Sequence, residues 1–300
     1  PREVATGLQV PEGPVAMEDG SVLVVEIRRG TLSRVTATGG VEVVATLGGG
    51  PNGAAIGPDG AVYVCNNGGF EWHQAGDYML PGDQPGDYSG GRIERVDLGT
   101  GDVTTLYTEC GGNPLRGPND LVFDEHGGFW FTDFGKVRAR DRDRGGLYYA
   151  LPDGSSVREV IYPVDGPNGV GLSPDGSMLY YAETYTGRVW QRRVKGPGEV
   201  EPPGLADLLV GFPGAVFLDS LAVDSGGNVC VGTLGMTPGI TVISPEGEYE
   251  VVSAGGAFFD PLVTNICFGG DDLRTAYWTC SSTGRLIAGD WPRPGLRLAF

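Results

Sequence analysis

The chain repeats one short phrase six times at nearly even intervals. In each repeat a carboxylate or amide residue precedes a short apolar run, a Gly-rich turn and a second β-rich run. The spacings between consecutive polar residues are 40, 67, 49, 51 and 46. β-rich repeats of about 50 residues are typical of propellers, whose units pack radially around a channel. The six polar residues are Glu12, Asn52, Asn119, Asn168, Asp219 and Asn265.

The fourth repeat shows the strand pattern of one unit. Strand-like runs at residues 169–172, 179–183, 188–194 and 208–210, the third of them alternating, are separated by turns in which Pro and Gly supply the special backbone angles. Six such four-stranded units predict an all-β fold, a six-bladed β-propeller with a central metal-binding channel, formed by residues 1–300 as a single domain. Residues 2–5 are expected to pair into the last blade, which would close the ring and protect the strand edges.

The composition supports a folded β protein, and the net charge argues against one class of partner. The 53 Gly and 22 Pro punctuate a chain in which 40% of residues are hydrophobic and grouped in strand-length runs. A net charge of −17 argues against nucleic acid as a partner, because its phosphates would be repelled. We see neither a signal peptide nor an apolar run of membrane-spanning length, so we expect a cytoplasmic protein with no membrane partner. The sequence does not indicate an oligomeric state.

The five cysteines are scattered along the chain without a CxxC pair. Most of them lie inside apolar β runs, so we expect small buried side chains in a reducing compartment. They are Cys65, Cys110, Cys230, Cys267 and Cys280.

Six equivalent oxygens around one axis would form a site for a hard cation. The two carboxylates, Glu12 and Asp219, carry a formal charge of −2 that balances a divalent ion without excess repulsion. Ligands that are all oxygens favour Ca²⁺ or Mg²⁺ over Zn²⁺ or Cu²⁺. The two histidines, His73 and His126, are not spaced as a metal pair, and His126 lies in a turn that we expect to be exposed.

Strand direction predicts which loops surround this site. Each innermost strand starts at the ring of oxygens, so the loop after every second strand returns to the same face and should wall the pocket. The loop of the second repeat, residues 67–90, is long and aromatic, which favours a structureless functional lid over a surface insertion packed on itself. Residues 136–144, rich in Arg and Asp, are expected to form a solvated loop. The walling loops begin at Glu26, Asn66, Asp133, Glu183, Thr233 and Cys280.

Several phrases resemble the SMP-30/gluconolactonase/luciferin-regenerating-enzyme family of six-bladed propellers, over nearly the whole chain. These phrases are Glu12-Gly13-Pro14, Gly117-Pro118-Asn119-Asp120, Pro167-Asn168-Gly169, Asp219-Ser220-Leu221 and Gly128-Phe129-Trp130-Phe131-Thr132-Asp133-Phe134. The resemblance implies one divalent ion in the central channel. It also implies that this ion is held by Glu12, Asn119, Asn168 and Asp219.

The resemblance also suggests substrate contacts. Asn67 is a plausible counterpart of family residues near the lactone. Asn119, already a candidate metal ligand, is also a candidate for contact with substrate. Asn52 completes the geometric ring and is a candidate for contact with substrate. Trp72 and His73, in the lid, are further candidates.

The ring of oxygens predicts a bound divalent ion, and the family resemblance implies a metal-dependent hydrolase that opens a lactone ring. Ca²⁺ is the expected ion, with Mg²⁺, Mn²⁺ and Zn²⁺ as alternatives, and the partner is a small-molecule lactone. Asp219 is the candidate base, acting on water directly or through a metal-bound water. Two other hypotheses stay open, namely a phosphotriester (organophosphate) hydrolase on the same scaffold and a non-catalytic propeller with a structural ion.

Overall fold

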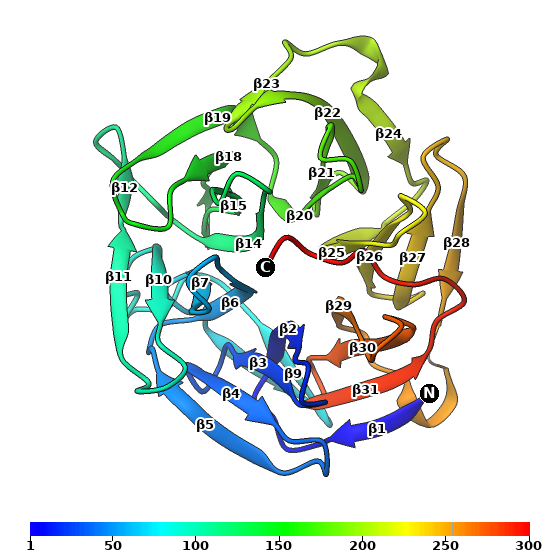
Figure 1. Cartoon of the computed structure of the whole chain (residues 1–300). Coiled ribbons are helices and arrows are strands. Elements are labelled where there is room, and N and C mark those ends of the chain that lie inside the picture. The colour runs from blue at the N-terminus through cyan, green and yellow to red at the C-terminus, as the bar shows by residue number, and fades with distance from the viewer. Residues whose placement is uncertain (254) are drawn as a thin grey trace.

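The computed structural model describes residues 1–253 and 255–300 and consists of six antiparallel sheets arranged radially around one axis (Figure 1). This confirms the predicted all-β, six-bladed propeller. The helical segments of the described residues are two single 3₁₀ turns, Leu205–Asp207 and Gly256–Phe258. The innermost strands of neighbouring blades contact one another all the way around the axis.

Each blade has four radial strands, which follow one another from the axis outward. Blade 1 has β2 (Pro11–Ala16), β3 (Val22–Glu26), β4 (Thr31–Val35) and β5 (Val41–Thr46). Blade 2 has β6 (Pro51–Ile56), β7 (Val62–Asn66), β10 (Arg92–Val96) and β11 (Val103–Tyr107). Blade 3 has β14 (Pro118–Phe123), β15 (Phe129–Asp133), β18 (Gly145–Ala150) and β19 (Val157–Val164).

The other three blades follow the same plan. Blade 4 has β20 (Pro167–Leu172), β21 (Met178–Glu183), β22 (Arg188–Gly196) and β24 (Leu208–Gly211), with β23 (Glu199–Val200) also paired to β22. Blade 5 has β25 (Phe217–Val223), β26 (Val229–Leu234), β27 (Gly239–Ile243) and β28 (Tyr249–Val252). Blade 6 has β29 (Val263–Gly269), β30 (Thr275–Cys280), β31 (Arg285–Asp290) and β1 (Arg2–Ala5).

The two ends of the sequence meet in blade 6, as predicted. Strand β1 pairs antiparallel with β31, with Arg2 opposite Ala288 and Glu3 opposite Ile287. Because the first strand of the chain is the outermost strand of the last blade, the ring is closed by backbone hydrogen bonds rather than by packing alone.

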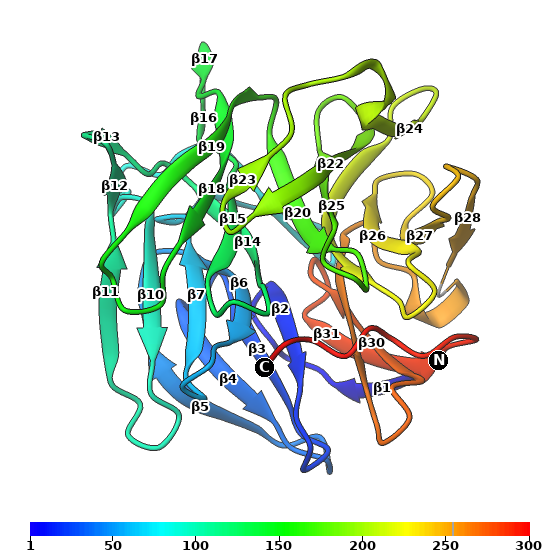
Figure 2. The ribbon, with the colours of Figure 1, turned by 45° about the horizontal axis from the view of Figure 1, so that its top comes forward.

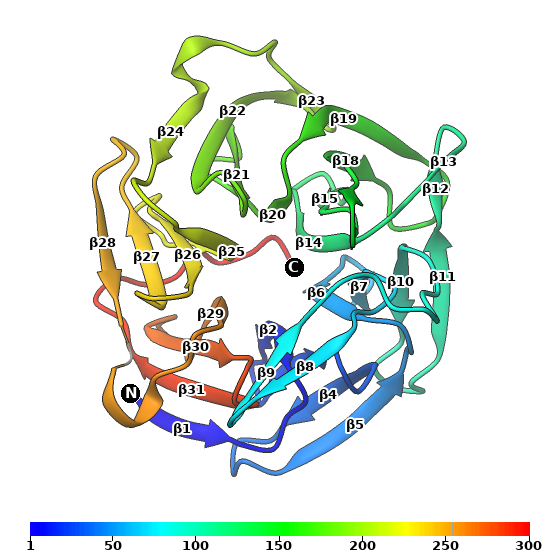
Figure 3. The same ribbon diagram turned by 180° about the vertical axis from the view of Figure 1, so that it is seen from behind.

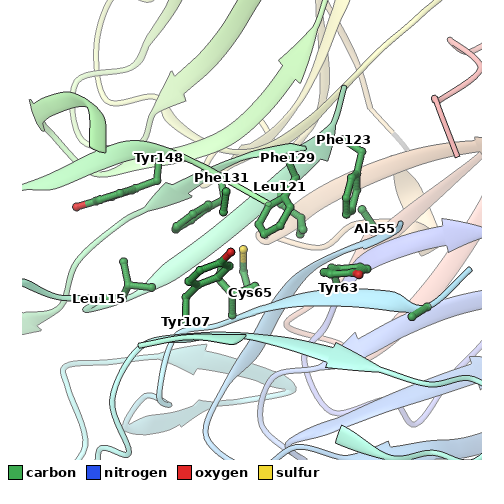
Figure 4. Close-up of a cluster of buried hydrophobic side chains, with 13 residues drawn as sticks. Ala55, Tyr63, Cys65, Tyr107, Leu115, Leu121, Phe123, Phe129, Phe131 and Tyr148 are labelled. Atoms are coloured by element: carbon green, nitrogen blue, oxygen red, sulfur yellow. The ribbon is translucent and has the colours of Figure 1, made fainter. Parts of the chain in front are cut away.

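Apolar side chains fill the spaces between neighbouring blades. Between blades 2 and 3, Tyr63 meets Phe123 edge to face, with ring centroids 5.0 Å apart, and Cys65 lies in the same cluster (Figure 4). All five cysteines are free thiols, and Cys65, Cys230 and Cys280 are fully buried, while Cys110 and Cys267 are half-buried. The expectation of buried apolar thiols is confirmed for the first three.

The last described residues cross the face on which the innermost strands end. Ser225 donates its backbone N–H to Pro294 O at 2.9 Å, and Leu296 donates to Val223 O at 3.1 Å. Phe300 then packs edge to face on Phe123, with centroids 5.9 Å apart, and the end of the chain lies near the axis (Figure 1). The opposite face, on which the innermost strands begin, is called the ring face below.

The lid, residues 67–90, crosses the ring face and is not structureless, contrary to expectation. It contains a hairpin of β8 (Trp72–Ala75) and β9 (Tyr78–Pro81), which runs from blade 2 over blade 1 (Figure 3). Near its tip, Met79 N–H donates to Ser282 O of blade 6 at 2.9 Å. A backbone ladder and this contact hold the segment in place.

The loop of residues 136–144 differs from the solvated loop that was expected. Its outer part is the hairpin of β16 (Val137–Arg138) and β17 (Asp141–Arg142), which projects from the molecule (Figure 2). A similar small hairpin is formed by β12 (Glu109–Cys110) and β13 (Asn113–Pro114). At the base of the first hairpin, Lys136 is only 2% exposed, so the expectation was wrong for this residue.

Glycine after the ring position allows neighbouring innermost strands to approach closely. A Cβ added at Gly53 would lie 2.5 Å from Asn119 O and 2.7 Å from the Cα of Asp120, both backbone atoms of the next blade. We predict that Gly53→Ala lowers the free energy of unfolding by about 1–3 kcal/mol through overpacking. Urea unfolding followed by circular dichroism measures this change.

Gly196→Ala is the matched control, because a Cβ at Gly196 meets nothing within 4 Å. Equal unfolding midpoints for the two variants would contradict the close approach at Gly53.

Candidate metal and catalytic site

The ring face carries the six polar residues at one structural position. All six lie within the first three residues of the innermost strands β2, β6, β14, β20, β25 and β29. In every blade the pairing between the first and second strands shifts register at this point, for example between Pro51 and Ala54 and between Leu218 and Leu221. A β-bulge changes the direction of the side chain at the bulge. At these six positions, therefore, the ring residues need not follow the alternation of side chains between the two faces of the sheet.

Three ring oxygens are buried without a hydrogen-bond partner among the described residues. They are Glu12 Oε1, Asn52 Oδ1 and Asn119 Oδ1, on residues that are 2%, 5% and 6% exposed. A buried oxygen that lacks a donor is costly, and a bound cation removes this cost. A divalent ion bound by oxygen ligands therefore fits these residues.

Hydrogen bonds fix the side chains of Asn168 and Asn265 and show that Asn265 differs from the rest. Asn265 donates Nδ2 to Glu12 Oε2 at 2.7 Å, while its own Oδ1 accepts the Ile266 N–H at 2.8 Å. Asn168 donates Nδ2 to Thr184 Oγ1 at 3.1 Å, which leaves its Oδ1 with one long contact from Ser220 Oγ at 3.4 Å. Asn265 thus holds Glu12 in place, whereas Asn168 presents an amide oxygen.

Carboxyl groups gather at the axis, and their pKa values are raised. Burial raises the pKa of Glu12 to about 7, against hydrogen bonds from Asn265 and others that lower it. Burial, followed by the negative charge of Glu12, raises the pKa of Asp219 well above its ordinary value. Asp219 is the partly exposed member of this pair, whereas Glu12 is buried.

Asp120 is a third carboxyl at the axis that the sequence analysis did not assign to the site. It is 6% exposed and accepts the backbone N–H groups of Leu121 at 2.9 Å and Val170 at 3.3 Å. Burial and the charge of Glu12 raise its pKa to about 8. A signal was present, because the residue after the ring position is Gly13, Gly53, Gly169, Ser220 or Ile266 in the other five repeats.

The residues at which the walling loops begin have a structural role. Glu26 accepts the Gln9 N–H at 2.7 Å, and Asn66 Oδ1 accepts the Gly50 N–H at 2.9 Å. Asp133 accepts the N–H of Gly117 at 2.7 Å. Glu183 accepts the Asp165 N–H at 3.3 Å. In four blades, therefore, the end of the second strand binds the segment that leads into the innermost strand and fixes where that strand begins.

The structure brings some of the predicted substrate residues together and separates others. Asn67 follows β7 and donates its N–H to Gly50 O at 2.8 Å, so it lies close in space to the start of β6, which carries Asn52. Trp72 and His73 lie on β8 of the lid hairpin, where Trp72 is half-buried and His73 is exposed. Asn52, Asn67 and Asn119 thus lie on or beside the inner strands, whereas Trp72 and His73 do not.

Among residues 1–253 and 255–300, no three His, Cys, Asp or Glu side chains are grouped so as to hold a metal ion. A site here therefore needs the amide oxygens of Asn119 and Asn168 beside the carboxylates. His126 is exposed, as expected for its turn.

Across the described part of the chain, no helix has the length and hydropathy needed to cross a lipid bilayer.

Comparison with known proteins identifies the class to which this propeller belongs. The family model described as SMP-30/gluconolactonase/LRE-like region matches residues 10–282. The chain therefore belongs to the SMP-30/gluconolactonase/LRE-like family, as the sequence phrases suggested.

Individual relatives agree with this assignment. The chain is 30% identical over 231 residues to a lactonase drp35 of Staphylococcus saprophyticus, a match that covers 76% of this chain and 64% of that protein. A gluconolactonase from Xanthomonas campestris has a similar fold, with a TM-score of 0.73 at 19% identity over 96% of this chain and 88% of the other. Regucalcin from Agrobacterium tumefaciens, a calcium-binding protein, gives a TM-score of 0.70 at 17% identity over 98% and 95%.

The raised pKa of Asp120 predicts that stability depends on pH. In the unfolded chain this carboxyl has its ordinary pKa of 3.8, and folding raises the value to about 8. The folded state binds the proton more tightly, so this contribution to stability is present below about pH 4 and is lost as the pH rises through 8.

We predict that Asp120→Asn, which cannot ionise, is at least about 1 kcal/mol more stable than the natural chain at pH 9, given 1.36 kcal/mol per pKa unit. At pH 5 the two should differ much less. Urea unfolding in the presence of a chelator measures both values. Asp290→Asn, at an exposed position, should keep the natural pH dependence, and the same dependence in Asp120→Asn would contradict the prediction.

Proposed function

We propose that this protein is a metal-dependent hydrolase that opens the ring of a lactone by attack of water. The observation that carries the proposal is the set of buried ring oxygens without a donor, together with Asp219, a ring residue that is partly exposed. The names of the relatives support lactones as the substrate class, since the Staphylococcus protein is called a lactonase and the Xanthomonas protein a gluconolactonase.

The ion would be held by Glu12, Asn119, Asn168 and Asp219. Two carboxylates and two amides make a ligand set that suits Ca²⁺, and four protein ligands leave positions for water and substrate. Similarity to a calcium-binding regucalcin also favours Ca²⁺ over Mg²⁺, Mn²⁺ or Zn²⁺. When bound, the ion supplies Lewis-acid polarisation of the lactone carbonyl and stabilises the developing negative charge.

The carboxyl groups at the axis would divide two tasks between them. Glu12 is buried and held by Asn265, an arrangement that suits a fixed anionic ligand. Asp219 is partly exposed, and its carboxylate can take a proton from the attacking water at Oδ1 or Oδ2. Burial and the negative charge of Glu12 raise the pKa of this carboxyl in the ion-free protein, whereas a bound cation would lower it.

The amides beside the ring would bind the substrate. Asn52 and Asn67 lie near the start of blade 2 on the ring face, and both are buried. Asn119 borders the same ring. The lid covers part of this face and contributes Trp72 and His73 as candidate contacts for a larger substrate.

The proposed activity is tested by following acid release from a panel of sugar and aliphatic lactones, after chelation and after adding back Ca²⁺, Mg²⁺, Mn²⁺ or Zn²⁺. We expect turnover that falls at least about 100-fold on chelation and recovers with Ca²⁺. A phosphotriester with a nitrophenol leaving group is included in the panel. Turnover of that compound alone would establish the organophosphate hydrolase instead, and no turnover with any metal would favour a non-catalytic propeller.

The role of Asp219 is tested by Asp219→Asn, which keeps an oxygen ligand but removes the charge and the base. We expect kcat to fall about 100-fold or more even at saturating metal, because a general base contributes on that scale. Calorimetric titration with Ca²⁺ shows whether the variant still binds the ion. Asp153→Asn, at an exposed turn, is the control. Turnover by Asp219→Asn at the natural rate, once metal is saturating, would rule out Asp219 as the general base.

A further inference from the structure

A buried lysine from blade 3 fastens the base of the lid. Lys136 and Lys195 are the two lysines of the chain, and Lys195 is exposed whereas Lys136 is 2% exposed. Lys136 Nζ donates to Gly69 O at 2.6 Å and lies 3.9 Å from the centroid of the Phe70 ring. Both partners belong to the first residues of the lid. Burying an amine is costly, so contacts of this kind must offset the cost.

The same amine also contacts Asn67, the residue at which the lid begins. Lys136 Nζ donates to Asn67 Oδ1 at 3.1 Å, and the Gly69 N–H donates to the same oxygen at 2.9 Å. An amide oxygen accepts two hydrogen bonds, so both of its acceptor positions are filled. Rotating the amide by a half turn would place its NH₂ group against these two donors.

The other end of the Asn67 amide has no partner. Its Nδ2 is buried and makes no hydrogen bond among the described residues. The residue as a whole is 2% exposed, so bulk water does not satisfy this nitrogen. The backbone of Asn67 is fixed as well, because its N–H donates to Gly50 O at 2.8 Å, two residues before Asn52. A buried amide nitrogen without an acceptor is a donor held ready for a ligand.

We infer that Lys136 is a positioning residue, which fixes the amide of Asn67 so that its NH₂ group donates a hydrogen bond to an oxygen of the bound lactone. Asn67 then acts on the substrate and not on the ion, because its oxygen is already occupied by two donors. Lys136 touches neither substrate nor ion and acts through Asn67. This inference rests on the proposed function, since it assigns a substrate contact to the same site.

A double-mutant cycle tests whether Lys136 acts through Asn67. The four proteins are the natural chain, Lys136→Met, Asn67→Ala and the double variant, with Lys195→Met as the matched control. On the lactone of the panel that is turned over fastest, we expect Lys136→Met to lower kcat/KM about tenfold, mostly through KM, because the amide is misplaced. In the Asn67→Ala background the same substitution should change kcat/KM by less than about twofold.

Asn67→Asp tests the NH₂ group itself. The carboxylate keeps an acceptor for Lys136 and Gly69 but has no donor. We expect a Tm no lower than that of the natural chain, because Lys136 gains an ionic partner, together with a kcat/KM reduced about tenfold or more. Natural kcat/KM in Asn67→Asp would overturn the inference.

Binding of δ-valerolactam, a ring analogue that resists hydrolysis, separates this inference from the proposed function. Calorimetry on the same four proteins should show the same non-additivity in Kd as in kcat/KM. Wild-type turnover with additive losses in the cycle would overturn the role of Lys136 and leave the hydrolase intact. Absence of turnover with non-additive lactam binding would overturn the hydrolase and keep the Lys136–Asn67 pair. Lactam binding that is absent or additive, without turnover, would overturn both.

Discussion

Carboxyl groups and side-chain oxygens without a hydrogen-bond donor are concentrated around one buried axis. The rest of this propeller is arranged so that these groups stay buried there. Glu12, Asp120 and Asp219 lie at the start of three innermost strands, and burial raises the pKa of each. Isolated carboxylates in such a place are tolerated only when they are protonated, hydrogen-bonded or neutralised by a cation. Six closed blades keep them in place, because no innermost strand can withdraw without breaking contacts with both neighbours.

The supporting structure around this axis is repeated rather than unique. A glycine or small residue lets adjacent inner strands touch, a bulge turns the ring residue out of the sheet, and a polar side chain at the end of the second strand binds the entering backbone. Because the bulge recurs in all six blades, the ring position is the same in each, and its chemistry can vary from carboxylate to amide without changing the backbone.

The lid adds what the repeated scaffold lacks, which is asymmetry. It arises from blade 2, is fixed at its base by Lys136 of blade 3 and touches blade 6 near its tip. Three blades are therefore connected across the ring face by one segment. In an enzyme that opens small rings, such a segment would limit the size of the substrate and exclude water from one side of the site.

The sequence by itself determined the all-β class, six blades and the position of the ring residues, because a period near 50 residues and alternating apolar runs are local signals. It also determined the closing strand at residues 2–5. Only the tertiary structure decided which oxygens lack partners and that Asn265 supports Glu12. Only the tertiary structure, likewise, decided that Asp120 lies at the axis. It also decided that Lys136 is buried, although the charged sequence of its loop predicted exposure to solvent. These properties depend on contacts between residues up to 253 positions apart, and no local pattern encodes the donors that a distant blade will supply.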